Sequence, residues 1–300
     1  MNTEQRPEHE QPWTVGRVIR WCEDYFRGKG AGAPRLDAEL LLARVLSCTR
    51  LRLYVDWNKL LEKEELAALR GLVARRGAGE PTAYILGERE FWSLRFKVTP
   101  DVLVPRPETE HAVEAVLEVA ARLGLRSPRI ADIGTGSGII ACALAKSLPT
   151  STIWASDVSQ AALAVAEENA RALGLVERIR FVRGDMLAPL AEAGPFDVLV
   201  SNPLYVGPDA WDELPEEVKR YEPEIALRGA GPDGLEAVER LLVEGLRVLA
   251  RPGAVVCEIG RGQSDRACAL AARARYREVA VKKDLAGVPR VVVAVVEADA

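Results

Sequence analysis

The stretch A-D-I-G-T-G-S-G, residues 131–138, begins inside an apolar run, R-I-A-D-I (129–133), and leads into a helical one, I-I-A-C-A-L-A-K-S (139–147). We therefore interpret it as the turn from a buried strand into a helix. Glycines at such a turn let a ligand approach the backbone, and the helix N-terminus offers free N–H groups. The alternative is a tight turn that binds nothing.

The spacing of these glycines separates two classes of ligand. A dinucleotide fingerprint, G-x-G-x-x-G, requires glycine at position 139, where this chain has Ile139. The observed G-x-G-x-G is typical of enzymes that use S-adenosylmethionine, a ligand without a pyrophosphate. The turn therefore predicts a set of cofactor contacts at Gly134, Thr135, Gly136, Ser137 and Gly138.

Strand-like and helical patterns alternate from residue 129 onward. The strand-like runs are 129–133, 152–156, 179–182, 196–200, 254–259, 278–281 and 290–296. Helical patterns lie between them at 139–147, 160–173 and near 234–250, with a last one before 278. Such alternation predicts an α/β fold with a doubly wound, mostly parallel sheet. The last two runs are close enough to form an antiparallel hairpin at the edge of that sheet.

Two further segments fit the same ligand. Asp157 ends the second strand, in W-A-S-D, where an ionised carboxylate accepts hydrogen bonds from both ribose hydroxyls. The alternative for Asp157 is a cap on the next helix. G-D-M (184–186) follows the third strand, where methyltransferases of this fold bind adenine. We expect Asp185 to accept from the exocyclic amine and Met186 to pack on the ring.

The residues before 129 predict a separate organisation. We expect a disordered tail at 1–12, a helical domain at 13–85, a β-hairpin connector at 86–105 and a methyltransferase domain at 106–300. Helical spacing of apolar residues recurs at 13–26, 35–46 and 62–76. In the connector, the alternating run 90–98 predicts a half-buried strand that pairs with V-L-V (102–104) across T-P-D. P-R-P-E-T-E (105–110) either shapes a pocket or caps the following helix.

Composition narrows the class of protein. Apolar residues make up 48% of the chain and charged ones 28%, which indicates a soluble globular protein. A net charge of −4 disfavours direct nucleic-acid binding. No apolar run is long enough to span a membrane, and the N-terminal residues do not resemble a secretion signal, so we expect no membrane association. Five cysteines without C-x-x-C spacing favour reduced thiols in the cytoplasm. With two histidines and no ligand cluster, we expect no metal site.

The fourth strand ends in an unusual exit, S-N-P-L-Y-V (201–206). In a doubly wound sheet, ligands bind beyond the carboxyl ends of the strands, so this exit faces the predicted cofactor. A planar NH₂ group fits it, because Asn202 Oδ1 and the Pro203 carbonyl can accept its two hydrogens. Tyr205 can stack on the flat group. We therefore expect catalytic roles for Asn202, Pro203 and Tyr205, and substrate contacts from these three and Leu204.

These motifs give the chain a resemblance to a known family. N-P-P-Y at this position marks methyltransferases that act on planar amides or nucleobases, and nearly the whole chain resembles the HemK-like (PrmC-type) release factor glutamine methyltransferases. The matching motifs are P-R-L-D-A-E-L-L-L-A (34–43), G-E-P-T-A-Y-I-L-G-E-R-E-F-W (79–92), V-L-V-P-R-P-E-T-E (102–110), A-D-I-G-T-G-S-G (131–138), S-N-P-x-Y (201–205), D-G-L (233–235), E-I-G (258–260) and D-L-A-G-V-P-R-V-V (284–292).

The resemblance implies an activity and a fold. It implies transfer of a methyl group from S-adenosyl-L-methionine, leaving S-adenosyl-L-homocysteine, to N5 of the glutamine in the Gly-Gly-Gln motif of bacterial class I release factors. It also implies a class I methyltransferase fold whose last strand is antiparallel, and a helical N-terminal domain that docks the release factor. Cofactor contacts are implied at Gly134–Gly138, Asp157, Met186 and Asn202. We expect a monomer.

Leu204 departs from the family pattern, which has a second proline there. A proline at 204 would hold residue 203 in an extended conformation and so aim the Pro203 carbonyl. Three alternatives therefore stay open. The chain could methylate another protein glutamine, such as one in a ribosomal protein, or an adenine amino group, or bind its partner with little turnover.

Overall fold

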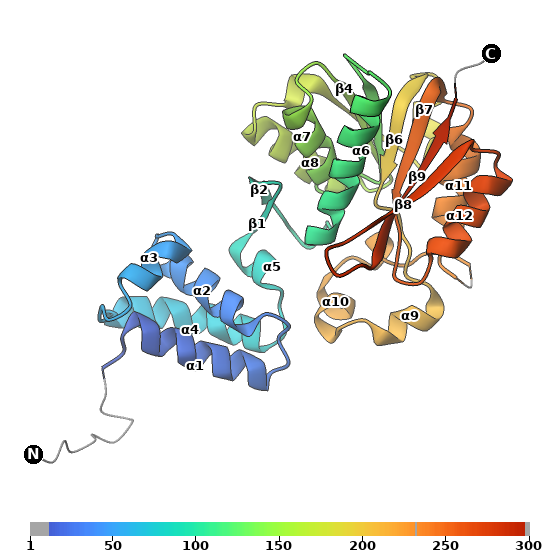
Figure 1. Ribbon diagram of the computed structural model, residues 1–300. Coiled ribbons are helices and arrows are strands. Elements are labelled where there is room, and N and C mark those ends of the chain that lie inside the picture. Colours follow the sequence, from blue (N-terminus) through green and yellow to red (C-terminus); the bar gives the residue numbers. More distant parts are fainter. Residues whose placement is uncertain (1–11, 232, 298–300) are drawn as a thin grey trace, which may run out of the picture. The chain divides into compact units, whose positions relative to one another are not determined.

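The computed structural model describes residues 12–231 and 233–297 (Figure 1). The chain forms two compact units, which divide between Gly87 and Glu88. The first unit contains the helical block, and the second contains the alternating strands and helices. The predicted disordered tail lies outside the described residues, apart from Pro12.

Five helices build the described part of the first unit, residues 12–87. They are α1 (Val15–Gly28), α2 (Pro34–Val45), α3 (Arg50–Val55), α4 (Lys63–Gly77) and α5 (Thr82–Leu86). Periodicity predicted α1, α2 and α4, whereas α3 and α5 have six and five residues and are too short to show a helical repeat. The unit buries an apolar core of its own, which includes Val15, Ile19, Phe26, Leu41, Leu42, Leu53 and Leu69.

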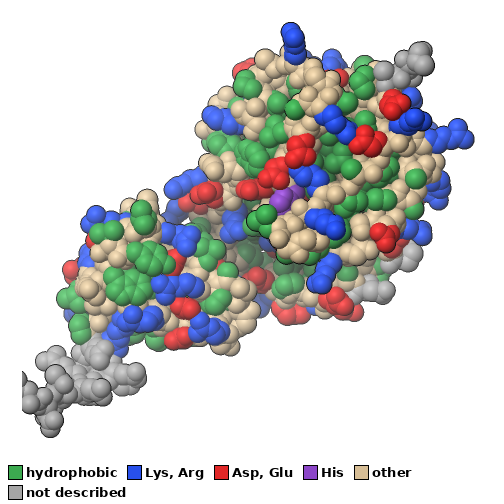
Figure 2. Space-filling model, viewed as in Figure 1, with side chains coloured by type: hydrophobic (Ala, Val, Ile, Leu, Met, Phe, Trp, Pro, Cys, Tyr) green, Lys and Arg blue, Asp and Glu red, His purple; other side chains and the backbone are tan. Residues whose placement is uncertain are grey.

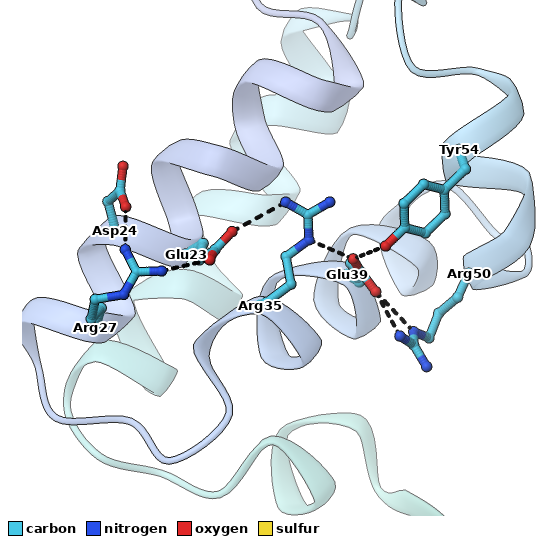
Figure 3. Close-up of polar contacts among 7 residues, drawn as sticks. All are labelled: Glu23, Asp24, Arg27, Arg35, Glu39, Arg50 and Tyr54. Atoms are coloured by element: carbon cyan, nitrogen blue, oxygen red, sulfur yellow. Dashed lines mark hydrogen bonds and ion pairs between the residues drawn. The ribbon is translucent and has the colours of Figure 1, made fainter.

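Glu39 on α2, only 1% exposed, connects three helices of this unit (Figure 3). Its Oε1 accepts hydrogen bonds from Arg35 Nε at 2.6 Å and from the Tyr54 hydroxyl at 2.5 Å, and its Oε2 accepts from Arg50 Nη2 at 2.7 Å. Arg35 also donates to Glu23 on α1 at 3.1 Å. Burial by itself raises the pKa of Glu39, but the hydrogen bonds outweigh it and lower that pKa.

A short hairpin opens the second unit. Strands β1 (Glu88–Phe91) and β2 (Leu94–Lys97) pair antiparallel across Trp92 and Ser93, whose φ angles are 52° and 56°. Two successive positive φ values give the tight turn that suits the twist of paired strands. The predicted pairing of 90–98 with 102–104 is therefore wrong, because the chain already reverses after Phe91 and 102–104 forms no strand.

Seven strands form the central sheet, in the order β5-β4-β3-β6-β7-β9-β8. They are β3 (Arg129–Ile133), β4 (Thr152–Asp157), β5 (Ile179–Arg183), β6 (Phe196–Ser201), β7 (Leu249–Glu258), β8 (Glu278–Lys283) and β9 (Pro289–Val296). The first five are parallel, and β9 runs antiparallel to both β7 and β8. This confirms the predicted doubly wound sheet and its terminal antiparallel hairpin.

Helices cover both faces of the sheet (Figure 1). One face packs against α6 (Glu110–Arg122), α7 (Ile139–Ser147) and α8 (Gln160–Ala172), and the other against α11 (Glu236–Gly245) and α12 (Ser264–Arg273). Successive strand residues point to opposite faces, so each strand feeds two apolar clusters. In β3, for example, Ile130 belongs to the first cluster and Ala131 to the second.

Between β6 and α11 the chain inserts two short helices that periodicity did not predict, α9 (Pro208–Glu213) and α10 (Glu216–Tyr221). Each has six residues, which is less than two helical turns. Short 3₁₀ helices complete the unit: η2 (Pro107–Thr109), η3 (Val176–Arg178), η4 (Ala188–Leu190) and η5 (Glu224–Ala226). The insertion follows the Asn202–Tyr205 exit and so contributes to the site described below.

Acidic and basic side chains are interspersed over the face of each unit drawn in Figure 2. Several form exposed ion pairs, such as Lys97 with Glu168 at 2.7 Å and Arg122 with Glu278 at 2.5 Å. Pairs of this kind contribute little to stability because water screens them. Within residues 12–231 and 233–297, no helix is both long and apolar enough to cross a membrane.

Candidate active site

A cavity of about 160 Å³ lies at the carboxyl edge of the sheet, beside β3, whose neighbours are β4 on one side and β6 on the other. Ligands of doubly wound folds bind at this kind of switch point. Ten predicted site residues line it: Gly134, Thr135, Gly136, Ser137, Asp157, Asp185, Met186, Asn202, Pro203 and Leu204. Two others, Gly138 and Tyr205, do not line this cavity.

The glycine turn is held against the end of β4. The N–H groups of Gly134 and Thr135 donate to the Ser156 carbonyl at 2.8 and 2.9 Å. Gly134 and Gly136 have φ values of 70° and 56°, and a Cβ at either position would meet nothing within 4 Å. These two glycines therefore leave open space over the backbone, which is what a ligand lying against the turn requires.

Gly138 has a different task. Its φ is 78°, and a Cβ there would come within 3.0 Å of the Ala166 side chain on α8. The third glycine therefore allows the turn and α8 to pack closely, and it does not face the cavity.

Asp157 binds the glycine turn through one carboxylate oxygen and the start of α8 through the other. Its Oδ2 accepts from Gly136 N at 2.9 Å, and its Oδ1 accepts from Ser159 N at 2.8 Å. The cap on α8 comes from the Ser159 hydroxyl, which accepts from Ala162 N. Each carboxylate oxygen can accept a further hydrogen bond, so Asp157 still has capacity for hydroxyl groups in the cavity.

Asp185 and Met186 follow β5 at the far side of the cavity. Asp185 is 64% exposed and forms an ion pair with Arg240 on α11, with 2.9 Å between Oδ2 and Nη2. Met186 has a φ of 48°, an uncommon value for a residue with a side chain, and it packs against the buried cluster on this face. The Asp185 side chain is therefore partly committed to α11.

Asp132, which the sequence analysis passed over, supports the turn from below. It is fully buried, and its Oδ2 accepts from the Thr135 hydroxyl at 2.6 Å and from Ala141 N at 3.1 Å. Its Oδ1 has no hydrogen-bond partner. Burial raises the pKa of Asp132 to about 7, against the opposing effect of these two hydrogen bonds. The signal in the sequence was an acid inside an otherwise apolar strand.

The Asn202–Tyr205 exit separates the first cavity from a second one of about 320 Å³. Asn202 and Pro203 line both cavities, whereas Tyr205 lines only the second. Apolar side chains form much of its wall. They are Leu103 and, from the segment between β6 and α11, Leu214, Val218 and Leu227. The exit thus lies between the cavity at the glycine turn and a second cavity lined by the segment that follows β6.

Several groups hold this exit in place. Asn202 Nδ2 donates to Thr109 Oγ1 at 3.2 Å, and the Tyr205 hydroxyl donates to Glu258 Oε1 at 3.3 Å. The Tyr205 carbonyl accepts from Gln263 Nε2 at 2.9 Å. Burial, with the adjacent carboxylate, raises the pKa of the Tyr205 hydroxyl well above its ordinary value. Tyr205 is therefore a neutral hydrogen-bond donor at physiological pH.

Leu204 differs from its neighbours in this loop. It is half-buried, and in the described part of the chain no group accepts a hydrogen bond from its N–H. Its carbonyl lies against Gly229, where an added Cβ would come within 3.0 Å of the oxygen. Packing therefore holds the Leu204 carbonyl, whereas its N–H has no acceptor among the described residues.

Of the two roles considered for the segment 105–110, the structure shows that it shapes the pocket, whereas no described side chain makes a capping hydrogen bond at the start of α6. Pro105, Arg106 and Thr109 line the first cavity, and 107–109 form the 3₁₀ turn that leads into α6. Arg106 forms an ion pair with Glu222, the C-cap residue of α10, whose second oxygen accepts from Val104 N at 3.0 Å. This segment therefore shapes the cavity and ties it to the insertion.

Family models match both units. A PrmC N-terminal domain model matches residues 17–87, and a methyltransferase domain model matches residues 130–221. A release factor glutamine methyltransferase of Rhodopirellula baltica is 44% identical over 286 residues, which is 94% of this chain and 96% of that protein. The chain belongs to the release factor glutamine methyltransferase family. Members from Chlorobaculum tepidum and Moorella thermoacetica are 46% and 47% identical, over 83% and 86% of this chain and 85% and 90% of theirs.

Solved structures agree on the fold. The hMettl16 catalytic domain, in complex with a MAT2A 3′UTR hairpin, matches with a TM-score of 0.55 at 18% identity, over 74% of this chain and 81% of that one. A delta-N METTL16 methyltransferase domain matches with a TM-score of 0.51 at 19% identity, over 69% and 90%. These matches support the methyltransferase fold of the second unit. No cluster of metal-binding side chains occurs among the described residues.

Proposed function

We propose that this chain transfers the methyl group of S-adenosylmethionine to the side-chain nitrogen of the glutamine in the Gly-Gly-Gln motif of class I release factors. The observation that carries the proposal is the position of Asn202 and Pro203, which line both the cavity at the glycine turn and the second cavity beyond it. A planar amide held there is next to the cofactor cavity. The names of the family's members support the same activity.

The first cavity has the groups that S-adenosylmethionine requires. That cofactor supplies an electrophilic methyl group on a sulfonium. Gly134 and Gly136 leave room over the backbone, and the Asp157 carboxylate has free acceptor capacity for the ribose hydroxyls. Met186 provides an apolar contact for the adenine, and Asp185 has a second oxygen, outside its pair with Arg240, for the adenine amine. In this assignment Gly138 supports the turn without touching the cofactor.

At the acceptor side, the chain works by positioning. Asn202 Oδ1 and the Pro203 carbonyl accept the two hydrogens of the glutamine amide, and the Tyr205 ring covers its flat face. An amide nitrogen is a poor nucleophile, so holding it in line with the methyl group is the main contribution that the protein makes. The surplus proton on nitrogen leaves after the transfer.

The helical first unit takes the role of docking the release factor. This unit matches the PrmC N-terminal domain model, and the alignment with the relatives extends over both units. These two findings support the assignment. Because release factors act on the ribosome, the reaction takes place in the cytoplasm.

The test is methyl transfer to a purified class I release factor, with the site mapped by peptide mass. We expect one added methyl on the motif glutamine, and none when that glutamine is replaced by alanine. Asn202→Ala removes one amide acceptor and should lower kcat by about 100-fold or more. Methyl groups on a different residue, or an Asn202→Ala variant as active as the parent, would contradict the proposal.

A further inference from the structure

Arg106 lies where the two cavities of the candidate active site meet. Five of the described residues line both cavities: Leu103, Arg106, Asn202, Pro203 and Ala226. Arg106 carries the one charged side chain among these five, and it has no chemical role in the function proposed above. An arginine presents five N–H groups in a planar fork. The junction therefore holds a strong group of hydrogen-bond donors beside the Asn202 loop.

The backbone at Arg106 is restricted by the proline that follows it. Pro107 disfavours a helical conformation at Arg106, whose φ and ψ are −100° and 139°. The Arg106 carbonyl accepts from Thr109 N at 3.2 Å, which closes the turn of η2. The direction in which the side chain leaves the backbone is therefore set before any ligand binds, and this lowers the entropy lost on binding.

Glu222 holds the guanidinium of Arg106 in place. The Glu222 side chain is 1% exposed, its Oε1 accepts from Arg106 Nη2, and its Oε2 accepts from Val104 N at 3.0 Å. Among the described residues, Glu222 is the one hydrogen-bond partner of the Arg106 side chain, which is 33% exposed. The N–H groups of Arg106 that Glu222 does not use can therefore donate to a ligand at the junction.

The second cavity has few other side chains that donate hydrogen bonds. Among the described residues that line it, only Arg106, Asn202 and Tyr205 have side chains with N–H or hydroxyl groups. Asn202 Nδ2 already donates to Thr109, and the Tyr205 hydroxyl already donates to Glu258. Arg106 is therefore the side chain with the most donors left for a ligand in this cavity.

A peptide in this cavity brings acceptors that need such donors. A main-chain carbonyl that leaves water without finding a new partner weakens binding. The two glycines of a Gly-Gly-Gln segment have no side chains that could shield or satisfy their carbonyls. Asn202 Oδ1 and the Pro203 carbonyl are acceptors, so they suit the hydrogens of the glutamine amide but not these carbonyl oxygens.

Two other oxygens suit Arg106 less well. The lone pair of the glutamine nitrogen is shared with the carbonyl oxygen of its own amide, so a cation on that oxygen would draw the lone pair away from the attacking nitrogen. The carboxylate of S-adenosylmethionine would belong to the first cavity. Arg106 is held instead by Glu222 at the end of α10, a helix whose Val218 lines the second cavity but not the first.

We propose that Arg106 is a substrate-binding residue that donates to a main-chain carbonyl of the peptide next to the acceptor glutamine, and that Glu222 is its positioning residue. Arg106 then holds the peptide while the Asn202 loop holds the amide, so both ends of the glutamine side chain are fixed. This inference rests on the proposed function for the identity of the peptide, but the contact can be measured as binding without turnover.

The test removes the donors without leaving a buried charge alone. Arg106→Met is combined with Glu222→Gln, because an unpaired Glu222 carboxylate would destabilise the fold. We expect the dissociation constant for a purified class I release factor, measured by calorimetry on protein loaded with S-adenosylhomocysteine, to rise about 10- to 100-fold. In methyl transfer, KM for the release factor should rise by a similar factor while kcat changes by less than about threefold. Affinity for S-adenosylhomocysteine should stay within about twofold of the parent.

Three further variants complete this series. Arg106→Lys keeps the charge but loses the planar fork, so we expect a smaller rise in the dissociation constant for the release factor. Arg106→Met alone should bind the release factor as weakly as the double variant, because Glu222 acts through Arg106. Arg122→Met is the matched control, since Arg122 pairs with Glu278 at the surface and lines neither cavity, and it should leave all these quantities unchanged.

Salt concentration identifies the kind of oxygen that Arg106 contacts. A carbonyl is uncharged, so the ratio of the dissociation constants of the double variant and the parent should change by less than about twofold between about 0.05 M and about 0.5 M salt. A contact with an acidic side chain of the release factor would be screened. A ratio that falls toward one at high salt would therefore overturn the carbonyl contact.

The remaining outcomes separate this inference from the proposed function. Unchanged affinity for the release factor in the double variant would refute the contact, and a loss confined to S-adenosylhomocysteine would assign Arg106 to the cofactor instead. If the parent binds the release factor but transfers no methyl group to it, and the double variant binds more weakly, the proposed function fails and the contact stands. A parent that does not bind the release factor would overturn both.

Discussion

Leu204 lies in a loop whose backbone is held on its C-terminal side. The Leu204 carbonyl packs against Gly229, and Gln263 holds the Tyr205 carbonyl at 2.9 Å. These contacts hold the backbone after Leu204, which limits how far the loop that carries the Pro203 carbonyl can shift. The departure from the family pattern therefore need not misdirect the Pro203 carbonyl.

The variant Leu204→Pro should therefore change little. No hydrogen bond is lost, because nothing among the described residues accepts from the Leu204 N–H. The extra rigidity is worth about 0.4–1 kcal/mol, so we expect kcat to rise by no more than about fivefold in the methyl-transfer assay. A rise of about 100-fold would show that the native loop aims its carbonyl poorly.

The raised pKa of Asp132 predicts that the free energy of unfolding depends on pH. Its pKa is raised from 3.8 to about 7, so between these values the folded protein holds a proton that the unfolded chain releases. Stability from this site is therefore greatest at low pH and falls as the pH rises toward 7. Asp132→Asn removes the cost of ionising a buried carboxyl, so its stability relative to the parent should increase between pH 4 and pH 8.

The free energy of unfolding of Asp132→Asn relative to the parent should increase by at most about 4 kcal/mol, a bound that follows from the size of the pKa shift. Urea unfolding of both proteins at several pH values measures it. If the two free energies of unfolding differ by the same amount at every pH, the Asp132 carboxyl is not perturbed as described.

At the scale of elements, the turn that contains Gly234 supports the acceptor loop. A Cβ on Gly234, whose φ is 71°, would come within 2.5 Å of the Tyr205 carbonyl oxygen. Gln263 bridges the same two segments, because its Nε2 donates both to the Tyr205 carbonyl and to the Asp233 carbonyl, at 2.9 and 2.8 Å. This explains why D-G-L and S-N-P-x-Y occur together in the sequence.

Gly234→Ala should therefore displace the acceptor loop. We expect kcat to fall by about tenfold or more, with affinity for S-adenosylhomocysteine nearly retained, because the glycine turn after β3 is untouched. The matched control is Gly124→Ala, at a φ of 65° with nothing within 4 Å of the added Cβ. Both variants lose about 1 kcal/mol from backbone strain, but only Gly234→Ala has a collision. Equal kcat values for the two variants would contradict this account.

Helices and strands could be predicted from the sequence where the pattern that indicates them lies within the segment itself. The alternation of 129–133 with 139–147 follows from apolar spacing within each segment, and the structure reproduces both bounds as β3 and α7. The β1–β2 hairpin was paired wrongly because its turn consists of Trp92 and Ser93, not the usual glycine or asparagine. The α9 and α10 helices are too short for a periodic pattern.

At the scale of the molecule, the first unit is held together by polar contacts as well as by its core. The buried carboxylate of Glu39 on α2 pairs with Arg35 on the same helix and with Arg50 on α3 (Figure 3). Arg35 also pairs with Glu23 on α1, so the contacts connect all three helices. The two arginines are a third or more exposed, so water screens much of the attraction. The hydrogen bonds to the buried carboxylate remain the larger contribution.

Glu39→Gln should loosen the first unit alone. We expect a loss of about 1–2 kcal/mol at neutral pH, seen as faster amide exchange over residues 15–86 of the full chain, with exchange over 88–297 unchanged. Because the folded pKa of Glu39 lies below its ordinary 4.5, the loss should be present above that pH and vanish as the pH falls through the folded value.

Arg52→Gln, which breaks the exposed pair with Asp56 outside this network, is the control and should have almost no effect. Faster exchange in both units of Glu39→Gln would contradict a purely local role.

The sequence by itself determined the sheet, the glycine turn and the candidate loop at Asn202. Each depends on neighbours along the chain, through side-chain periodicity, positive φ or the restricted backbone around proline. Only the tertiary structure decided what holds that loop. Thr109 and Glu258 reach it from 93 and 53 residues away, and neither has a local pattern that announces its partner. The register of β3, β6 and β7 brings these residues together at one edge of the sheet, and that register arises from packing of the whole unit.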